Sequence, residues 1–138
     1  MAWYNEPMNE DNIFTKIVKG EIPCNKVYED ELTLAFLDIH PVQPGHTLVI
    51  PKKQIEFVWD MDDENYQAVM ATAKKVAQRL KEVIGKPFIG SEVVGVDVPH
   101  AHIHLIPFST PLEFRRIPDM SAEPNFAELE KMAARLAF

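Results

Sequence analysis

One long stretch of helical periodicity lies in the middle of this 138-residue chain. Apolar residues recur there at intervals of three and four positions, which is typical of an amphipathic helix. They are Tyr66, Val69, Met70, Ala73, Val76, Ala77, Leu80 and Ile84. The acidic residues from Asp60 to Glu64 suit the start of this helix, and Lys81 and Gly85 mark its end. About twenty residues at about 1.5 Å each span roughly 30 Å, so the helix is long enough to cover a whole sheet.

The remainder of the chain reads as short β-prone runs separated by turns. Strands are expected over residues 27–29, 32–37, 46–51, 88–96 and 100–108, and a short helix over 13–19. Pro124 is expected at the first position of a last helix. That helix would bury Phe126, Leu129, Met132 or Ala133, and Leu136. Runs of strands around one long helix favour an α+β fold with an antiparallel sheet.

The composition excludes several functional classes. The chain has 21 acidic and 14 basic residues, which gives a formal net charge of −7, so its surface suits neither a nucleic-acid backbone nor an anionic membrane. No apolar run approaches the ~18 residues of a membrane span, and the first twenty residues lack the apolar stretch of a signal peptide. Cys24, the single cysteine, cannot form an internal disulfide. We therefore expect one cytoplasmic domain with no nucleic-acid and no membrane partner.

Three histidines alternate in the last expected strand. Alternate side chains of a strand lie on one face, so His100, His102 and His104 are expected roughly 6.6 Å apart at each step along that face. Ring nitrogens gathered in this way all need hydrogen-bond partners, which favours a functional site over a purely structural one. Imidazole is also a zinc ligand, so a metal site built from these three residues stays open at this point.

Several blocks precede the histidine run. They are Phe14, Lys16-Ile17-Val18, Gly20-Glu21-Ile22-Pro23, Ala35-Phe36-Leu37-Asp38-Ile39 and Pro44-Gly45-His46. In this order, and with the alternating histidines behind them, the blocks resemble the histidine triad (HIT) family of nucleotide hydrolases and transferases. The resemblance covers about residues 13–108.

The resemblance implies an architecture and a substrate. The expected fold is a five-stranded antiparallel sheet with one long helix and a short N-terminal helix, to which this chain adds a C-terminal helix. We expect an N-terminal arm at 1–11, the HIT domain at 12–110 and a C-terminal extension at 111–138. Members commonly pair, so a homodimer is expected. The implied substrate is a purine nucleotide, in particular a nucleoside phosphoramidate, whose α-phosphate carries the leaving group.

By resemblance, the middle histidine, His102, is the nucleophile. A neutral imidazole that donates from one nitrogen to a backbone carbonyl, here that of His100, keeps a lone pair on the other nitrogen. Attack on the α-phosphorus would expel the leaving group and give a nucleotidyl-histidine, which water then cleaves. His104 and His46 would bind phosphate oxygens or hand a proton to the leaving group, and His100 would orient the set. No metal and no other cofactor is expected.

The resemblance also implies a nucleotide pocket. Asp38 matches the acidic residue that accepts hydrogen bonds from the ribose hydroxyls. The residues that match the apolar base pocket are Ile22, Phe36, Ile39 and Leu48.

The sequence departs from the family pattern before the triad. Val96 and Asp97 stand where many members carry polar residues that contact phosphate. Asp97 would bring negative charge toward an anionic substrate, or hydrogen-bond a triad histidine and raise its pKa. Residues 12–15 contain no cysteine, so the structural zinc that some members hold through an early Cys-x-x-Cys is not expected. His40 is expected on the surface. Arg115 and Arg116, beyond the resemblance, are also expected there, although tails in the family lie close to the active site, which leaves a role for them and the last helix open.

Three other functions compete with the phosphoramidate hydrolase. A hydrolase of dinucleoside polyphosphates would use the same nucleophile on a different leaving group. A metal-binding protein would use the three alternating histidines as ligands. A nucleotide-binding protein without catalysis is suggested by Val96 and Asp97.

Overall fold

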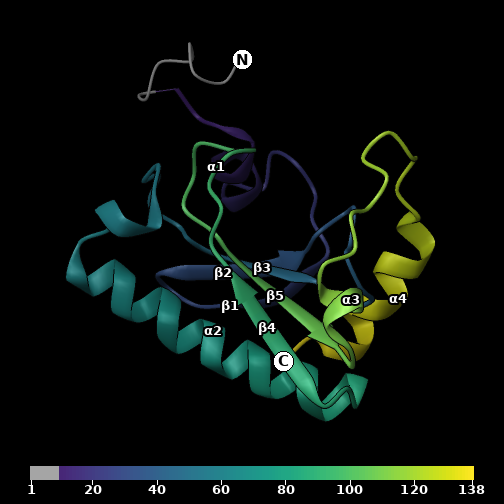
Figure 1. Ribbon diagram of the computed structural model, residues 1–138. Helices are drawn as coiled ribbons and strands as arrows, with labels where there is room; N and C mark the ends of the chain where they lie inside the picture. Colours follow the sequence, from purple (N-terminus) through teal and green to yellow (C-terminus); the bar gives the residue numbers. More distant parts are fainter. Residues whose placement is uncertain (1–9) are drawn as a thin grey trace.

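The computed structural model describes residues 10–138 and consists of one antiparallel sheet with helices on both faces (Figure 1). The sheet contains β1 (Lys26–Glu29), β2 (Thr33–Leu37), β3 (Thr47–Pro51), β4 (Phe88–Glu92) and β5 (Ile103–Phe108). Their order is β1-β2-β3-β5-β4, and every neighbouring pair is antiparallel. The expected α+β fold with a five-stranded antiparallel sheet is confirmed. All but the last two residues of the expected N-terminal arm lie outside the described part of the chain.

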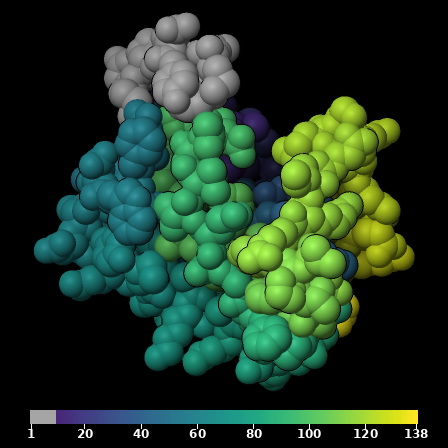
Figure 2. All heavy atoms as spheres, in the orientation of Figure 1, coloured from purple at the N-terminus to yellow at the C-terminus, as the bar shows by residue number. Residues whose placement is uncertain are grey.

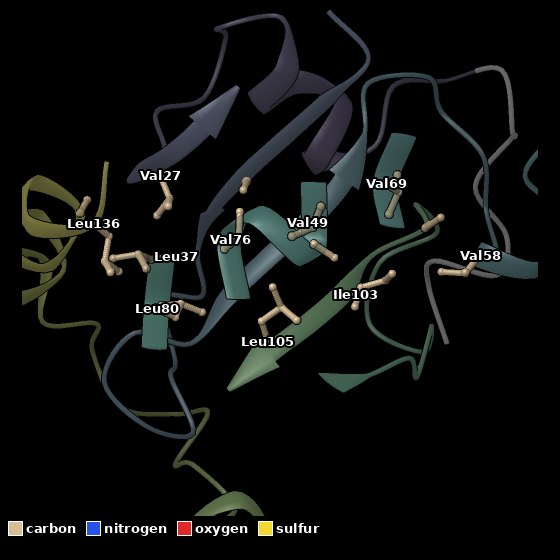
Figure 3. Close-up of a cluster of buried hydrophobic side chains, with 14 of the residues drawn as sticks. Val27, Leu37, Val49, Val58, Val69, Val76, Leu80, Ile103, Leu105 and Leu136 are labelled. Atoms are coloured by element: carbon tan, nitrogen blue, oxygen red, sulfur yellow. The ribbon is translucent and has the colours of Figure 1, made fainter. Parts of the chain in front are cut away.

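The long helix α2 (Asp63–Ile84) covers one face of the sheet. Its buried residues pack against alternate residues of the central strands, and Figure 3 shows this core. The helix ends where Gly85 adopts a φ of 76° and its N–H bonds the carbonyl of Lys81, a left-handed conformation that glycine accepts without strain. Residues 58–60, just before the helix, form a separate 3₁₀ turn, η2 (Val58–Asp60). Core residues labelled in Figure 3 include Leu37, Val49, Ile103 and Leu105 from the sheet and Val69, Val76 and Leu80 from α2.

The opposite face of the sheet carries the short helix α1 (Ile13–Val18) and the histidines. Asn12 caps α1, because its side chain accepts from the N–H of Thr15. Phe14 packs into a second apolar cluster on this face, with Leu34, Phe36, Leu48 and Ile50. The strand register places Leu48 directly opposite both Phe36 and His104. Residues directly opposite each other share a face, so this register brings the family's apolar positions next to the histidines.

The C-terminal extension folds back onto the sheet. It contains α3 (Pro111–Phe114) and α4 (Phe126–Leu136), and α4 contributes Leu129, Ala133 and Leu136 to the same core as α2. The expectation that Pro124 begins the last helix is wrong, because Asn125 caps α4 and Pro124 lies before the cap. The expected burial of Phe126 is also wrong, since 57% of this residue is exposed. Helix α3 has no counterpart among the expected elements.

Two strands are shorter than expected by three or four residues. β5 begins at Ile103, because the N–H of His100 bonds Val98 and the N–H of Ala101 bonds Ile55 instead of a neighbouring strand. β4 ends at Glu92, and the chain then turns through Gly95, whose φ is 78°. No helix within residues 10–138 has both the length and the hydropathy to cross a membrane.

Candidate active site

A cavity of about 450 Å³ opens on the face of the sheet that carries the histidines. His102, His104 and Asp38 supply its chemistry, and Phe14 from α1 contributes to its apolar wall. Figure 2 shows a hollow between the segment around residue 95, in green, and the C-terminal extension, in yellow-green and yellow. Residues of the extension, Met120 and Phe126, complete the lining. Residues near both ends of the described chain therefore line the cavity.

The ring of His102 is oriented by one backbone contact. Its Nδ1 lies 2.7 Å from the carbonyl oxygen of His100, and only 3% of the residue is exposed. A carbonyl oxygen can only accept, so Nδ1 carries the proton and Nε2 of the neutral ring keeps a free lone pair. The edge-to-face contact with Phe14, at 5.3 Å between ring centroids, restricts the ring further. His102 is thus held as the tautomer that a nucleophilic imidazole requires.

The ring of His100 is fully buried beneath the site. Its Nε2 donates to the carbonyl oxygen of Pro51 at 2.8 Å, and its Nδ1 lies 3.3 Å from both Asn12 Oδ1 and Thr15 Oγ1. Burial lowers the pKa of His100 to about 4, so the ring is neutral near pH 7. His100 is absent from the cavity lining, and what it presents to His102 is its backbone carbonyl.

His46 and His104 form a hydrogen-bonded pair. The N–H of Val42 donates to His46 Nδ1 at 3.0 Å, so that nitrogen must carry the lone pair. Burial lowers the pKa of both rings to about 4. In the neutral His46 ring the proton therefore sits on Nε2, which donates to His104 Nδ1 at 2.9 Å. It follows that His104 carries its own proton on Nε2.

Asp38 lies beside this pair, at the end of β2. Its Oδ1 accepts from the N–H of His40 at 2.8 Å, and its Oδ2 lies 3.7 Å from His46 Nε2. Burial raises the pKa of the Asp38 carboxyl, and the His40 N–H opposes that rise by stabilising the charged form. Since His46 is neutral, the 3.7 Å approach is not an ion pair.

The structure gathers most, but not all, of the expected pocket residues. Phe36, Ile39 and Leu48 line the cavity. Ile22 does not, and it lines a separate hollow together with Val18 and Gly20. Asp97 lines the cavity, but no hydrogen bond within residues 10–138 joins it to a histidine. Its charge acts to raise the pKa of His104, and burial outweighs this effect.

The sequence favoured a surface position for the C-terminal extension, but the structure places part of it at the cavity. Met120 and Phe126 line the cavity although 61% and 57% of these residues are exposed. His40, expected on the surface, is half-buried, lines the cavity and donates from Nε2 to the carbonyl oxygen of Ala122 at 3.0 Å. Arg116 is exposed as expected, yet it donates to two backbone carbonyls, those of Pro41 and Val42. None of these contacts follows a helical or strand period, so the sequence held no periodic signal for them.

In the structure, the side chains that are placed to hold a metal ion are not the three alternating histidines. Asp38, His46 and His104 each offer one ligand atom, and these atoms lie within 4.8 Å of one another. His100 is not part of this set, because its ring is fully buried and does not line the cavity. Within residues 10–138, the Asp38 group is thus the set of His and Asp side chains arranged to hold a metal ion.

Comparisons with known proteins agree with this architecture. An adenosine 5'-monophosphoramidase of Schizosaccharomyces pombe is 41% identical over 96 residues, which cover 69% of this chain and 72% of that protein. The crystal structure of a HIT-like protein from Bartonella henselae has a TM-score of 0.78 and 33% identity, covering 91% of this chain and 94% of its own. That of a zinc-bound histidine triad family protein from Mycobacterium smegmatis has a TM-score of 0.69 and 30% identity, covering 90% of this chain and 94% of its own.

The HIT domain family model matches residues 19–110. The match contains His46 and the three alternating histidines, and it leaves α1 and the C-terminal extension outside. With two thirds of the chain matched, and with these residues gathered at one cavity, the chain belongs to the HIT family.

Proposed function

We propose that this chain is a hydrolase of purine nucleoside phosphoramidates that works through a covalent nucleotidyl intermediate on His102. The observation that carries the proposal is the 2.7 Å contact between His102 Nδ1 and the His100 carbonyl, at the wall of a cavity large enough for a nucleotide. This contact leaves the Nε2 lone pair free for attack on phosphorus. The similarity to the S. pombe phosphoramidase supports the choice of substrate class.

The proposed reaction has two displacements at the α-phosphorus. His102 Nε2 forms a bond to phosphorus, the bond from phosphorus to the leaving amine breaks, and the amine takes a proton as it departs. Water then attacks the same phosphorus, the bond to His102 breaks, and a nucleoside monophosphate leaves. We propose that the departing amine takes this proton from water in the cavity, because the neutral rings of His46 and His104 are too weakly acidic to give one up, and that the attacking water returns a proton to solvent. The Nε2–H of His104 donates to phosphoryl oxygens as charge builds on them.

The nucleoside occupies the remainder of the cavity in this proposal. The Asp38 carboxylate lines the cavity, and the His40 N–H holds it in place through one of its oxygens. In this proposal it accepts hydrogen bonds from the two ribose hydroxyls. Phe36, Ile39 and Leu48 provide the apolar wall for a flat base. The lining includes Asp38 and Asp97 and, among the described residues, no lysine or arginine. A short phosphoramidate suits this charge pattern better than the polyphosphate chain of a dinucleotide does.

We also propose that the protein acts as a homodimer in the cytoplasm. Among the strands of residues 10–138, β4 pairs only with β5 and is therefore an edge strand with one row of backbone groups outside the sheet. Beside it lies an apolar groove whose lining includes Trp59, Met70 and Val93, with exposed fractions of 74%, 43% and 38%. A second copy related by a two-fold axis would pair the edges and cover this groove. Sedimentation velocity tests the idea: the wild type should sediment as a dimer and Trp59→Lys as a monomer, while a monomeric wild type would exclude it.

An assay without metal tests the proposed chemistry. In the presence of EDTA, the wild type should release adenosine monophosphate from an adenosine phosphoramidate faster than it cleaves a dinucleoside polyphosphate. His102→Ala should lose activity by on the order of a thousandfold. Leu112→Ala, at a site that is 82% exposed, serves as the control and should match the wild type. Full activity in His102→Ala would refute the mechanism, faster turnover of the polyphosphate would favour that substrate class, and binding without turnover would favour a nucleotide-binding protein.

A divalent metal site is the second candidate function. It is favoured by the convergence of Asp38, His46 and His104, whose neutral imidazoles and carboxylate are ligands that suit zinc, and by the zinc-bound relative from M. smegmatis. Elemental analysis of protein purified without chelators distinguishes this function. About one zinc per chain that is lost in Asp38→Ala would support a metal site, and less than a tenth of an equivalent would exclude it.

A further inference from the structure

The C-terminal extension, residues 111–138, is hydrogen-bonded to the loop that leads from Asp38 to His46. Gln43 Nε2 donates to the carbonyl of Glu113 at 2.9 Å, and His40 Nε2 donates to that of Ala122 at 3.0 Å. Arg116 Nη1 donates to the carbonyl oxygens of Pro41 at 3.2 Å and of Val42 at 3.0 Å. The extension lies beyond the segment that the family model matches, so these contacts belong to this chain's own C-terminal part.

One peptide unit of this loop connects Arg116 to the histidines. The carbonyl of Pro41 and the N–H of Val42 belong to the same peptide, which is planar and trans, so the two groups point in opposite directions. Arg116 holds the oxygen end, and His46 Nδ1 accepts from the N–H end at 3.0 Å. A cation at the oxygen polarises the peptide and strengthens its N–H as a donor. The Arg116 guanidinium therefore orients the Val42 N–H toward His46 and makes it a stronger donor.

That peptide determines which nitrogens of the histidine pair carry protons. With the Val42 N–H facing His46, the proton of His46 sits on Nε2 and that of His104 on its own Nε2. If the peptide flipped, a carbonyl would face His46 Nδ1 and draw the proton to that nitrogen. His46 Nε2 would then accept from His104 Nδ1, and His104 would turn a lone pair toward the substrate phosphate. The flipped arrangement repels the oxygens that the observed arrangement binds.

We propose that Arg116 is a positioning residue of the active site: by clamping the Pro41–Val42 peptide it keeps His104 in the Nε2–H tautomer. The consequence for catalysis rests on the proposed hydrolysis, whereas the consequence for the tautomer does not. Because His104 donates to charge that builds up in the transition state, loss of the clamp lowers kcat more than it changes KM.

Arg115 supplies a matched control. It is the neighbouring arginine, it is exposed, and among the described residues no hydrogen bond or ion pair of its side chain occurs, so Arg115→Ala makes the same change of charge without touching the clamp. Arg116→Lys is the conservative variant, because an ammonium group can still donate to the two carbonyls. Thermal unfolding of each variant shows whether it is folded before any other comparison is made.

Two measurements test the inference. Long-range ¹H–¹⁵N NMR of the histidine side chains, without substrate, should find the His46 and His104 protons on Nε2 in the wild type and in Arg115→Ala, and a shift toward Nδ1 in Arg116→Ala. In the hydrolysis assay, Arg116→Ala should lower kcat about three- to tenfold with KM nearly unchanged, and Arg116→Lys should recover most of the loss.

The possible outcomes separate this inference from the proposed function. If Arg116→Ala matches Arg115→Ala in both tautomer and kcat, or if it changes KM alone, the positioning role is wrong. If the wild type hydrolyses no phosphoramidate, the proposed function fails and the NMR comparison still decides on the clamp. If Arg116→Ala does not fold, Arg116→Lys and Arg116→Met take its place, with the wild-type tautomer expected for lysine and the shifted tautomer for methionine, which has no donor.

Discussion

His102 Nδ1 lies 2.7 Å from the backbone carbonyl oxygen of His100. The contact joins the ring of His102 to the main chain of His100 and not to the ring of His100. The His100 ring is in turn fixed by its bond to Pro51 and by Asn12 and Thr15 at the start of α1. The orientation of the nucleophile thus depends on a buried polar cluster beneath the cavity.

Asp38→Asn should weaken binding of the ribose. The amide oxygen can still accept from the His40 N–H, so the loop keeps its shape, but the charge that strengthens bonds from the hydroxyls is lost. We expect KM for a ribonucleotide substrate to rise about tenfold, and KM for the matching 2′,3′-dideoxynucleotide to change little. An equal rise for both substrates would show that Asp38 does not contact the ribose.

Leu136→Ala should destabilise the whole domain. Leu136 is fully buried in the core shared with α2, although it lies beyond the segment matched by the family model. Truncation of a buried leucine costs about 2–5 kcal/mol of the free energy of unfolding. The matched control is Leu112→Ala, where 82% of the residue is exposed and a change below about 0.5 kcal/mol is expected. Urea denaturation measures both, and equal stabilities for the two variants would mean that α4 is not part of the core.

Stability should fall as the pH falls from about 6.5 to about 4. Burial lowers the pKa values of His46, His100 and His104 from 6.5 to about 4, so the unfolded chain binds more protons than the folded chain in this window. The free energy of unfolding therefore decreases with acidification, by up to about 1.4 kcal/mol per pH unit for each histidine. Urea denaturation at pH 7, 6 and 5 measures the slope. His46→Gln should reduce that slope, and a stability that stays constant from pH 7 to pH 5 would contradict the buried neutral rings.

The sequence predicted the parts of the fold that depend on local periodicity. The spacing of Val69, Val76 and Leu80 placed α2 and its buried face correctly, because an amphipathic pattern records which side of a helix is covered. Boundaries set by distant contacts were harder to predict. β5 begins three residues late because the N–H of Ala101 bonds Ile55, a partner 46 positions away that no local pattern indicates.

In the candidate site too, local patterns were predicted from the sequence and distant contacts were not. The alternation of the triad histidines could be read from the sequence, although only His104 lies within β5, whereas the tautomers could not be predicted. The bond from His46 to His104 joins residues 58 positions apart, and its polarity is set by the N–H of Val42. Met120 and Phe126 line the cavity, and Arg116 contacts the loop before His46, which is far from it in sequence, in an extension whose helix α4 packs into the core.

The most direct test of the central claim is mass spectrometry of the intact protein, quenched within milliseconds of mixing with an adenosine phosphoramidate, followed by peptide mapping. The account predicts a transient adduct with the mass of one adenylyl group, located on the peptide that contains His102 and absent from His102→Ala. An active wild type that never forms the adduct, or an adduct that persists in His102→Ala, would contradict it.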